Sequence, residues 1–372
     1  MALIRFVRRF RQMVLVKGSA EFKLAVGCCR ANFRGEAPAD DRIEADWGRF
    51  VDLIGFHRIE GLAWKALSAN SSAAPEAVVA RLSDAAKAIA ARNLQAAADC
   101  HALLDRFDAA GVPLLFLKGL TLGALAYGNP AIKSAIDLDL LIDPTDLGRA
   151  AELLRAAGYE LAAPRNSPAD RVLHAWHRGW KESVWSKSAP GLQLDLHTRT
   201  ADNPRLIPRI DVHAQRQSVH LGSGIRVPTL ADDELFAYLT VHGASSAWFR
   251  LKWVSDFAAF LHNRPDIDRL YERSQELGAG RAAGQALLLA DELFGTLEAS
   301  PELRRQLGRD RVTRRLFEIA LRLLTKAPIE PTQQRLGTLA IHRTQFLLLP
   351  GLPYKVSEVA RQASRLLAWP RS

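Results

Sequence analysis

The segment AIDLDLLID, residues 135–143, constrains the fold of this chain more than any other part of its sequence. Its residues alternate, so in a β-strand Asp137 and Asp139 point to one face while Leu138 points to the other. Two neighbouring carboxylates on an apolar strand repel each other and destabilise the fold unless a cation lies between them. A solvent-facing strand edge is the alternative, but the following Leu140–Ile142 run favours burial. The pattern predicts a strand that carries a cation site.

A third carboxylate occurs in GLQLDLHT, residues 191–198. Asp195 lies in another apolar strand candidate, and His197 follows two residues later on the same face. Hard divalent cations prefer oxygen ligands, and Mg²⁺ typically binds one or two protein carboxylates together with substrate phosphates. Asp137, Asp139 and Asp195 are therefore candidate ligands for Mg²⁺ or Mn²⁺, in a site for one or two ions. His197 either contacts a phosphate, orients Asp195 or is a buried residue bonded to the backbone.

A glycine turn precedes these segments in PLLFLKGLTLG, residues 113–123. A strand is expected to end at Lys118 and Gly119, with a helix beginning directly afterwards. Glycine at such a turn lets backbone N–H groups approach a phosphate, and the helix N-terminus favours negative charge. Lys118 can neutralise a phosphate directly. A strand-glycine-helix turn is common, so the signal depends on the acidic strand that follows it.

The texture of the sequence divides the chain into three parts. Residues 1–95 have a helical pattern and residues 231–372 are again helical, with breaks at prolines. Between them, residues 96–230 contain short apolar runs of strand length, namely PLLFLKG, AIDLDLLID, ESVWS, GLQLDLHT and IRVPTL. One amphipathic helix is expected inside this part, with Asp143 as N-cap, Pro144 at its first position and Gly158 at its end.

Charge and cysteine content restrict the partners and the compartment. The 50 Lys and Arg residues against 40 Asp and Glu give a formal charge of +10, which favours nucleotides, nucleic acid or an anionic membrane face. No RNA-binding module is recognisable, so nucleic acid has no firm support. Cys28, Cys29 and Cys100 match neither a zinc site nor a disulfide framework, and the first residues lack the apolar run of a signal peptide. A cytoplasmic location is expected.

Both ends of the chain are basic and amphipathic when read as helices. They are MALIRFVRRFRQMVLV at the start and KVSEVARQASRLLAWP near the end. Such helices either contact a membrane surface weakly or dock on their own domain. Docking is the favoured interpretation, because neither segment carries a lipidation signal.

Several motifs together resemble a known family. They are Leu117-Lys118-Gly119, Tyr127, Lys133, Asp137 to Ile142, Gly158-Tyr159, Asp195-Leu196-His197, and a helical element with His242, Trp253 and Asp256. From about Asp46 to about Leu261 the sequence resembles an uncharacterised bacterial nucleotidyltransferase family of the DNA polymerase β-type superfamily. The resemblance implies an α+β fold, with a polymerase β-type core of a small mixed sheet and helices flanked by N- and C-terminal helical regions.

The resemblance also implies roles for single residues. Asp137 and Asp139 would bind Mg²⁺, Asp195 would complete the acidic triad, and Gly119 would shape the phosphate turn. Lys118, Lys133, His197 and Lys252 join Gly119 as candidate nucleotide-binding residues. The chain departs from the wider pattern at Lys118-Gly119-Leu120, where Gly-Ser or Gly-Gly is usual, and at Lys133, where Arg is more usual.

Two functions from different classes follow. The first is an enzyme that moves a nucleoside monophosphate from an NTP to a hydroxyl or phosphate acceptor and releases pyrophosphate, with Asp137, Asp139 and Asp195 as catalytic residues. The acceptor, a small molecule, peptide or protein, is not specified by any motif. The second is a catalytically inactive protein that keeps the fold and only binds a nucleotide or a partner. The altered turn at Lys118 is its best support.

Other polar and aromatic residues have simpler interpretations. His174 and His177 have the spacing of a metal pair on a helix, but no third ligand is near in sequence, so they are expected at the surface or near the substrate. Arg250 and Lys252 could meet a triphosphate, although a basic helix face is more often solvated. The eight Trp residues are expected in the core.

Overall fold

The computed structural model describes residues 18–36, 44–69, 74–164, 170–187, 193–326, 328–334 and 336–368. The basic segment MALIRFVRRFRQMVLV, for which a docked helix or a membrane contact was expected, lies outside the described residues. None of the helices in these ranges is both long and apolar enough to cross a bilayer.

Helices make up most of the described chain. Those before the first strand are α2 (Ala20–Arg34), α3 (Trp47–His57), α4 (Glu60–Ser68) and α5 (Glu76–Ala109). Those between strands are α6 (Leu120–Tyr127), α7 (Leu147–Ala156) and α8 (Asp170–Gly179), with the 3₁₀ turn η1 (Pro144–Asp146). Those after the last strand are α9 (Asp232–Ser245), α10 (Leu251–His262), α11 (Ile267–Leu277), α12 (Arg281–Phe294), α13 (Pro301–Arg309), α14 (Arg311–Leu324), α15 (Leu339–Leu347) and α16 (Leu352–Ala368), with the 3₁₀ turn η2 (Pro331–Gln333).

A small mixed sheet lies in the middle of the chain. Its strands are β1 (Leu114–Phe116), β2 (Asp137–Ile142), β3 (Glu160–Ala163), β4 (Glu182–Ser186) and β5 (Gln193–His197), and its spatial order is β1-β2-β5-β4-β3. Strands β2 and β5 are parallel, and the other pairs are antiparallel. A separate antiparallel pair contains β6 (Arg216–Gly222) and β7 (Ile225–Leu230). The expected α+β class with a small mixed sheet is confirmed.

The expected helix after the acidic strand is also present. Asp143 accepts a hydrogen bond from the Thr145 backbone N–H at 2.8 Å and caps η1, which leads directly into α7. Gly158 has a φ of 83° just beyond the helix, the left-handed conformation that favours glycine. These two residues fix the ends of the helix that lies between β2 and β3.

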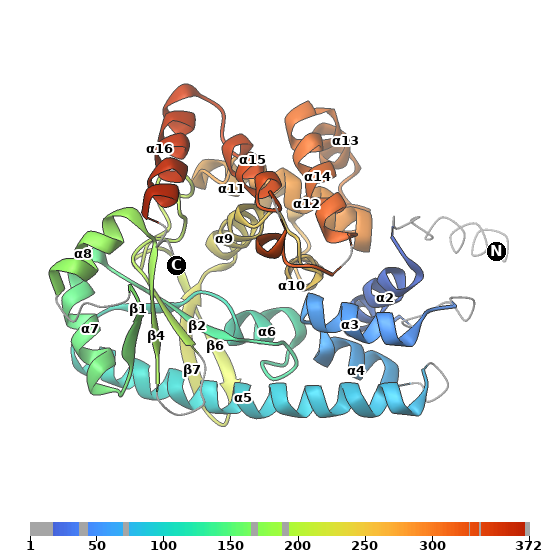
Figure 1. The fold of residues 1–372 in the computed structure, drawn as a ribbon, viewed down its shortest axis with the longest axis horizontal. Coiled ribbons are helices and arrows are strands. Elements are labelled where there is room, and N and C mark those ends of the chain that lie inside the picture. Colours follow the sequence, from blue (N-terminus) through green and yellow to red (C-terminus); the bar gives the residue numbers. More distant parts are fainter. Residues whose placement is uncertain are drawn as a thin grey trace.

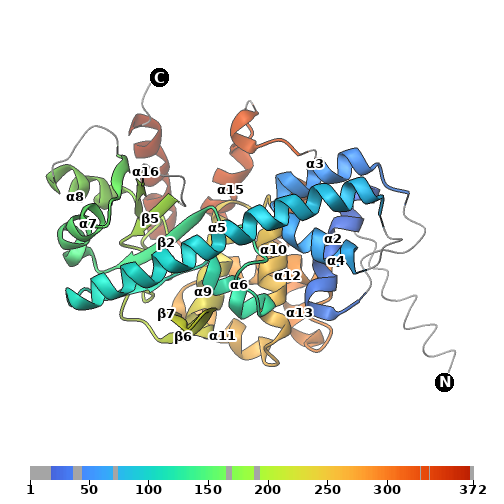
Figure 2. The same cartoon turned by 90° about the horizontal axis from the view of Figure 1, so that it is seen from below.

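The 34-residue helix α5 links the two halves of the molecule. Its first part packs against α4, and its later part packs against β7 and α7. Figures 1 and 2 show it running along one side of the molecule, from the N-terminal helices to the sheet. Because α5 crosses residue 95, the boundary expected there between the N-terminal region and the core falls within one continuous helix. The division into three regions stays a prediction.

Two groups of buried apolar side chains form the core. One lies around the sheet and its helices and includes Leu140, Trp185 and Leu196. The other joins the N-terminal helices to the C-terminal ones and includes Trp248. Both of these tryptophans are fully buried, as expected for core residues. The other five described tryptophans are only partly buried, so the expectation that all lie in the core is wrong for Trp47, Trp64, Trp176, Trp180 and Trp253.

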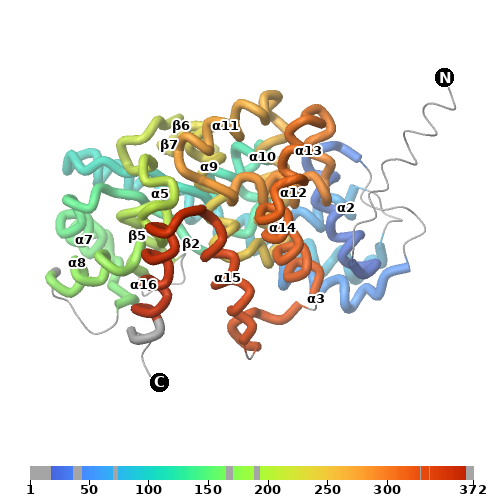
Figure 3. Tube along the Cα trace, turned by 90° about the horizontal axis from the view of Figure 1, so that it is seen from above, coloured from blue at the N-terminus to red at the C-terminus, as the bar shows by residue number. Residues whose placement is uncertain are grey.

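Helix α16, which contains most of the basic tail, docks on the rest of the chain with its polar side inward. Glu358 and Arg361 are buried and ion-paired, and the Asn203 amide donates to Glu358 at 2.9 Å. Leu352 and Val356 are 74% and 60% exposed on the opposite side. Figure 3 shows α16 lying across the surface beside α15. The expected docking is therefore made by buried polar contacts and by Tyr354, which belongs to the apolar core, and not by the stripe that contains Leu352 and Val356.

Candidate active site

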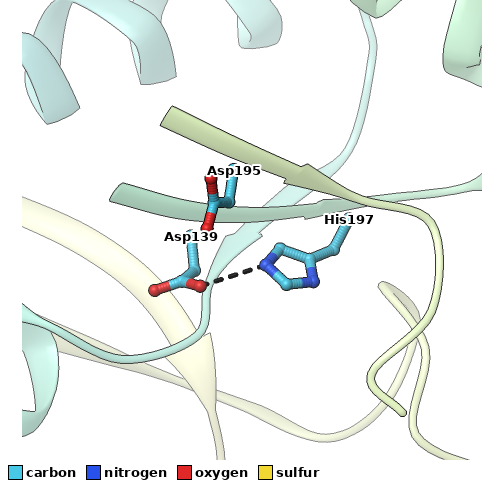
Figure 4. Close-up of side chains that lie close together, drawn as sticks. All are labelled: Asp139, Asp195 and His197. Atoms are coloured by element: carbon cyan, nitrogen blue, oxygen red, sulfur yellow. Dashed lines mark hydrogen bonds and ion pairs between the residues drawn. The ribbon is translucent and has the colours of Figure 1, made fainter. Parts of the chain in front are cut away.

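The parallel pairing of β2 and β5 brings two of the three predicted carboxylates together, Asp139 and Asp195, whereas Asp137 lies opposite Gln193 and is not part of the group with metal-ligand spacing. In this register Asp139 lies directly opposite Asp195. One ligand atom from each of Asp139, Asp195 and His197 lies within 4.8 Å of the others. Figure 4 shows these three side chains close together. Two strands far apart in sequence thus form one acidic cluster at the centre of the sheet.

Asp139 is the most enclosed member of this cluster, with 2% of its surface exposed. Its Oδ2 forms an ion pair with Lys118, and its Oδ1 lies 3.0 Å from Nε2 of His197. Burial by itself would raise the pKa of Asp139, but the Lys118 charge and the His197 contact outweigh it and hold the pKa well below its usual range. Asp139 is therefore a carboxylate at neutral pH.

Lys118 supplies a cation between the two aspartates of β2. Its Nζ is ion-paired with Asp139 and lies 3.5 Å from Oδ2 of Asp137. Burial lowers the pKa of Lys118, but the two carboxylates outweigh it and leave the pKa well above the ordinary value. The Lys118 ammonium group thus supplies part of the positive charge that the two carboxylates of β2 require. Asp137 itself is less buried than Asp139, with a side chain that is 26% exposed.

Asp195 lacks such compensation. Burial, followed by the charges of Asp139 and Glu182, raises its pKa to about 6. Its Oδ1 accepts a hydrogen bond from the Gln193 amide at 3.2 Å. The cluster therefore contains more negative charge than the nearby cations neutralise. Carboxylate oxygens with this excess charge fit a hard divalent ion such as Mg²⁺.

Lys181 and Glu182 extend the cluster, and no sequence motif identified them. Glu182 Oε2 lies 3.4 Å from Nδ1 of His197 and is ion-paired with Lys181. The His197 ring therefore lies between two carboxylates. Its Nε2 contacts Asp139, whereas its Nδ1 faces Glu182 but is buried without a hydrogen-bond partner. The available signal was a charged residue at the start of ESVWS, since β4 pairs Glu182 directly with His197.

The glycine turn lies beside the acidic strand. Gly119 has a φ of 71° and a ψ of −115°, a conformation that is essentially restricted to glycine, and it precedes the first residue of α6. A Cβ built at Gly119 would lie 3.5 Å from the backbone oxygen of Asp137. The first N–H groups of α6 thus begin next to β2, where they can bind an anion.

A pocket of about 110 Å³ joins the turn to the acidic strand. It contains five of the residues expected to bind the nucleotide or the metal ion, namely Lys118, Gly119, Lys133, Asp137 and Lys252. It is also lined by Arg58, Trp248, Trp253 and His242, among others. Arg58 was not identified from the sequence, since it lies outside every motif. Asp139, Asp195 and His197 do not line this pocket, but Lys118, which does line it, is ion-paired with Asp139.

Lys133 and Lys252 line the pocket although both are largely buried. Lys133 Nζ is 3.0 Å from Asp256, and Lys252 Nζ donates to the Ser134 carbonyl at 3.0 Å. Burial, followed by the charge of Lys133, lowers the pKa of Lys252 to about 7. Asp256 also accepts a hydrogen bond from Tyr127 at 3.1 Å. Three residues of the family pattern, Tyr127, Lys133 and Asp256, therefore form one contact group.

Other residues considered in the sequence have structural roles. His177 is buried, and its ring contacts Thr198 at 2.9 Å and Ser183 at 3.0 Å, so the expected surface or substrate-side position is wrong for it. Arg250 is buried too, with its guanidinium on the Phe56 carbonyl and on Glu330. The start of α10 therefore does not form a basic face that is exposed to water.

The arrangement by itself defines a class of protein. Clustered carboxylates on a small mixed sheet, beside a glycine turn at a helix N-terminus and a basic pocket, suit the transfer of phosphorus-containing groups. A family model described as uncharacterised nucleotidyltransferase matches residues 44–295. The match covers more than half of the 372 residues, so the chain belongs to this nucleotidyltransferase family and is a transferase enzyme. No curated protein and no solved structure matches it.

Proposed function

We propose that this protein is a Mg²⁺-dependent nucleotidyltransferase that moves a nucleoside monophosphate from an NTP to a hydroxyl or phosphate acceptor. An acceptor oxygen attacks the α-phosphorus, the bond to the β-phosphate oxygen breaks, and pyrophosphate leaves. The observation that carries the proposal is the excess of negative charge around Asp139 and Asp195, next to the Gly119 turn. Membership of the nucleotidyltransferase family supports the same reaction.

We infer that Asp137, Asp139 and Asp195 hold the ion, with Mn²⁺ able to replace Mg²⁺. A bound divalent ion lowers the pKa of an acceptor hydroxyl and offsets charge on the phosphates. His197 orients the Asp139 carboxylate through the 3.0 Å contact, so we assign it a positioning role. The proposed acidic set thus combines two strands whose register is fixed by the sheet.

We further infer that the triphosphate binds at the Gly119 turn. The N-terminus of α6 presents backbone N–H groups there, and Lys118 is close enough to exchange a carboxylate partner for a phosphate oxygen. Lys133 and Lys252 line the same pocket as Lys118 and Gly119. The three cysteines are buried free thiols, which supports a reducing, cytoplasmic setting.

Asp137→Asn is the most direct test, because Asp137 is less buried than Asp139 and is held only by the longer Lys118 contact. We expect the variant to keep its fold and to lose about a thousandfold in transfer rate, which corresponds to several kcal/mol of transition-state stabilisation. The measurement is pyrophosphate release and label transfer from labelled NTPs in cell extract, followed by mass spectrometry of the product.

Asp108→Asn is the matched control, since Asp108 is an exposed carboxylate near the end of α5. It should leave turnover unchanged. Equal turnover of the Asp137→Asn variant and the wild type would contradict the proposal. NTP binding by calorimetry that does not depend on Mg²⁺ and yields no pyrophosphate would favour the inactive binding protein, with Lys118 acting as a permanent substitute for the metal ion.

A further inference from the structure

A second and larger pocket lies among the C-terminal helices, with a volume of about 720 Å³. Apart from Phe56 and Phe249, its lining residues lie between 319 and 362, beyond the segment 44–295 that the family model matches. This volume is within the range of about 300–1,000 Å³ that is typical of small-molecule sites. We call it the C-terminal pocket.

The C-terminal pocket has an apolar lining that comes mainly from two helices. From α14 the lining residues follow a helical face at Ile319, Leu323 and neighbouring positions, and from α15 they include Ala340 and Phe346. Phe56 and Phe249 complete this lining, with ring centroids 6.5 Å apart. Such a lining fits an aliphatic or aromatic body, because burying that body removes apolar surface from water.

The charged residues of the C-terminal pocket are all basic. Arg322, Lys326 and Arg343 line it, and no Asp or Glu is among its lining residues in the described part of the chain. All three are exposed, and within the described residues they form no ion pair. His342 also lines the pocket, and its Nδ1 is buried without a hydrogen-bond partner. Unpaired cations around an apolar cavity create a field that favours an anionic group.

We propose that the C-terminal pocket binds an amphipathic anion, a molecule with an apolar body and a phosphate, sulfate or carboxylate group. The apolar body contacts the phenylalanines, and the anionic group lies among Arg322, Lys326 and Arg343. This site is distinct from the pocket beside Gly119, because the two pockets share no lining residue. The Arg250 guanidinium packs over Phe56 and Phe249, at 5.0 and 5.1 Å from their ring centroids.

Calorimetry on the full chain tests the proposal with matched ten-carbon probes. Decyl phosphate should bind. Decanol, which has only the apolar chain, and inorganic phosphate, which has only the anionic group, should each bind at least tenfold more weakly. Decyltrimethylammonium should not bind, because its charge has the wrong sign. Equal affinity for the anionic and cationic probes, or no binding of decyl phosphate, would overturn the proposal.

Two variants and one control variant test whether decyl phosphate binds in the C-terminal pocket. Arg322→Glu combined with Arg343→Glu should weaken decyl phosphate binding at least tenfold, whereas Arg309→Glu, an exposed cation on α13, should not. Ala340→Trp should fill the cavity and abolish binding. Thermal unfolding of each variant checks that the fold is kept. If all variants bind decyl phosphate like the wild type, the site is elsewhere.

A membrane lipid could supply the same chemistry as a free amphiphile. Sedimentation with vesicles of anionic phospholipid separates the two sources. We expect the wild-type protein to bind vesicles no more than the variant with both Arg322→Glu and Arg343→Glu does. The reason is that the C-terminal pocket is proposed to take up one molecule and not a lipid surface. Binding to vesicles in the absence of any binding of decyl phosphate would contradict the proposal.

Discussion

Asp195 has an unfavourable position in the protein without bound metal. Its pKa of about 6 lies above the usual value for aspartate, so between about pH 4 and 6 the folded protein holds more protons than the unfolded chain. The free energy of unfolding therefore falls as the pH rises through this range. A residue that destabilises the fold in this way and lies beside Asp139 is typical of a functional site.

Asp195→Asn should accordingly stabilise the protein at pH 7.5 in the presence of EDTA. The expected gain is about 2 kcal/mol, because each pKa unit corresponds to about 1.4 kcal/mol and part of the effect is screened by solvent. The gain should shrink towards pH 4.5, where wild-type Asp195 is protonated. Urea unfolding at the two pH values measures it. An Asn variant no more stable than the wild type at pH 7.5 would show that the carboxylates are not crowded.

Gly119 offers a second test at the level of a single residue. Alanine is strained at a φ of 71° and a ψ of −115°, so Gly119→Ala should lower the free energy of unfolding by about 1–3 kcal/mol and weaken NTP binding. Gly55→Ala is the matched control. Gly55 lies within α3, and no atom lies within 4 Å of the position that a Cβ would take there, so alanine should stabilise by about 0.5–1 kcal/mol. Urea unfolding distinguishes the two, and a neutral Gly119→Ala would mean that the turn can relax.

The sequence predicted the acidic pair better than its surroundings. Alternation in DLDLL was sufficient to place Asp137 and Asp139 on one face, and the structure shows both within reach of Lys118. The contact of Glu182 with His197 depends on antiparallel pairing between β4 and β5, which no local pattern specifies. The assignments of Asp137, Asp139 and Asp195 as metal ligands stay predictions until the tests above are made.

Elements with a strong apolar pattern were identified, whereas two weak ones were missed. Strand β3 has only four residues, none of them buried, and β6 has polar or exposed residues at most of its positions. Both lie at the margin of their sheets, where little apolar surface is removed from water. Strands such as β2 and β5, which are flanked on both sides, have the near-continuous apolar runs that can be recognised in sequence.

Helix α16 shows how periodicity can mislead at the level of an element. An apolar stripe normally faces the core, but here Leu352, Val356 and Val359 are between 56% and 74% exposed. The inward side carries Glu358 and Arg361 instead, and Arg361 also donates to the Gln345 side chain at 2.8 Å. The attachment of α16 therefore depends on buried polar contacts.

Glu358→Ala should release α16, because it leaves Arg361 buried without a carboxylate partner. Removing one member of a buried ion pair typically costs about 3–5 kcal/mol. Glu302→Ala is the matched control, since Glu302 and Arg305 have the same spacing but are exposed, and the expected cost there is below about 1 kcal/mol. Limited proteolysis and hydrogen exchange within residues 352–368 measure the release. Equal protection of α16 in both variants would contradict this account of its attachment.

At the level of the whole molecule, one apolar core extends beyond the family-matched segment. Phe22 and Leu24 of α2 belong to it before residue 44, and Leu316, Leu324 and Leu348 belong to it after residue 295. All five side chains are at most 2% exposed. The helices at both ends of the described chain therefore complete the same core that supports α6 and α10.

A fragment restricted to residues 44–295 should for this reason fail to fold cooperatively. It would expose the apolar surfaces of α10 and α12 that α2 and α14 cover in the full chain, and the surface of α9 that α15 covers. Each Leu or Phe side chain that is no longer buried lowers the free energy of unfolding by about 1.5–3 kcal/mol. The sum over the lost side chains exceeds the stability of about 5–15 kcal/mol that is typical of a domain. Thermal unfolding and dye binding compare the fragment with the full chain. A soluble fragment with a sharp unfolding transition would show that the matched segment is an independent unit, and that the outer helices are an addition to it.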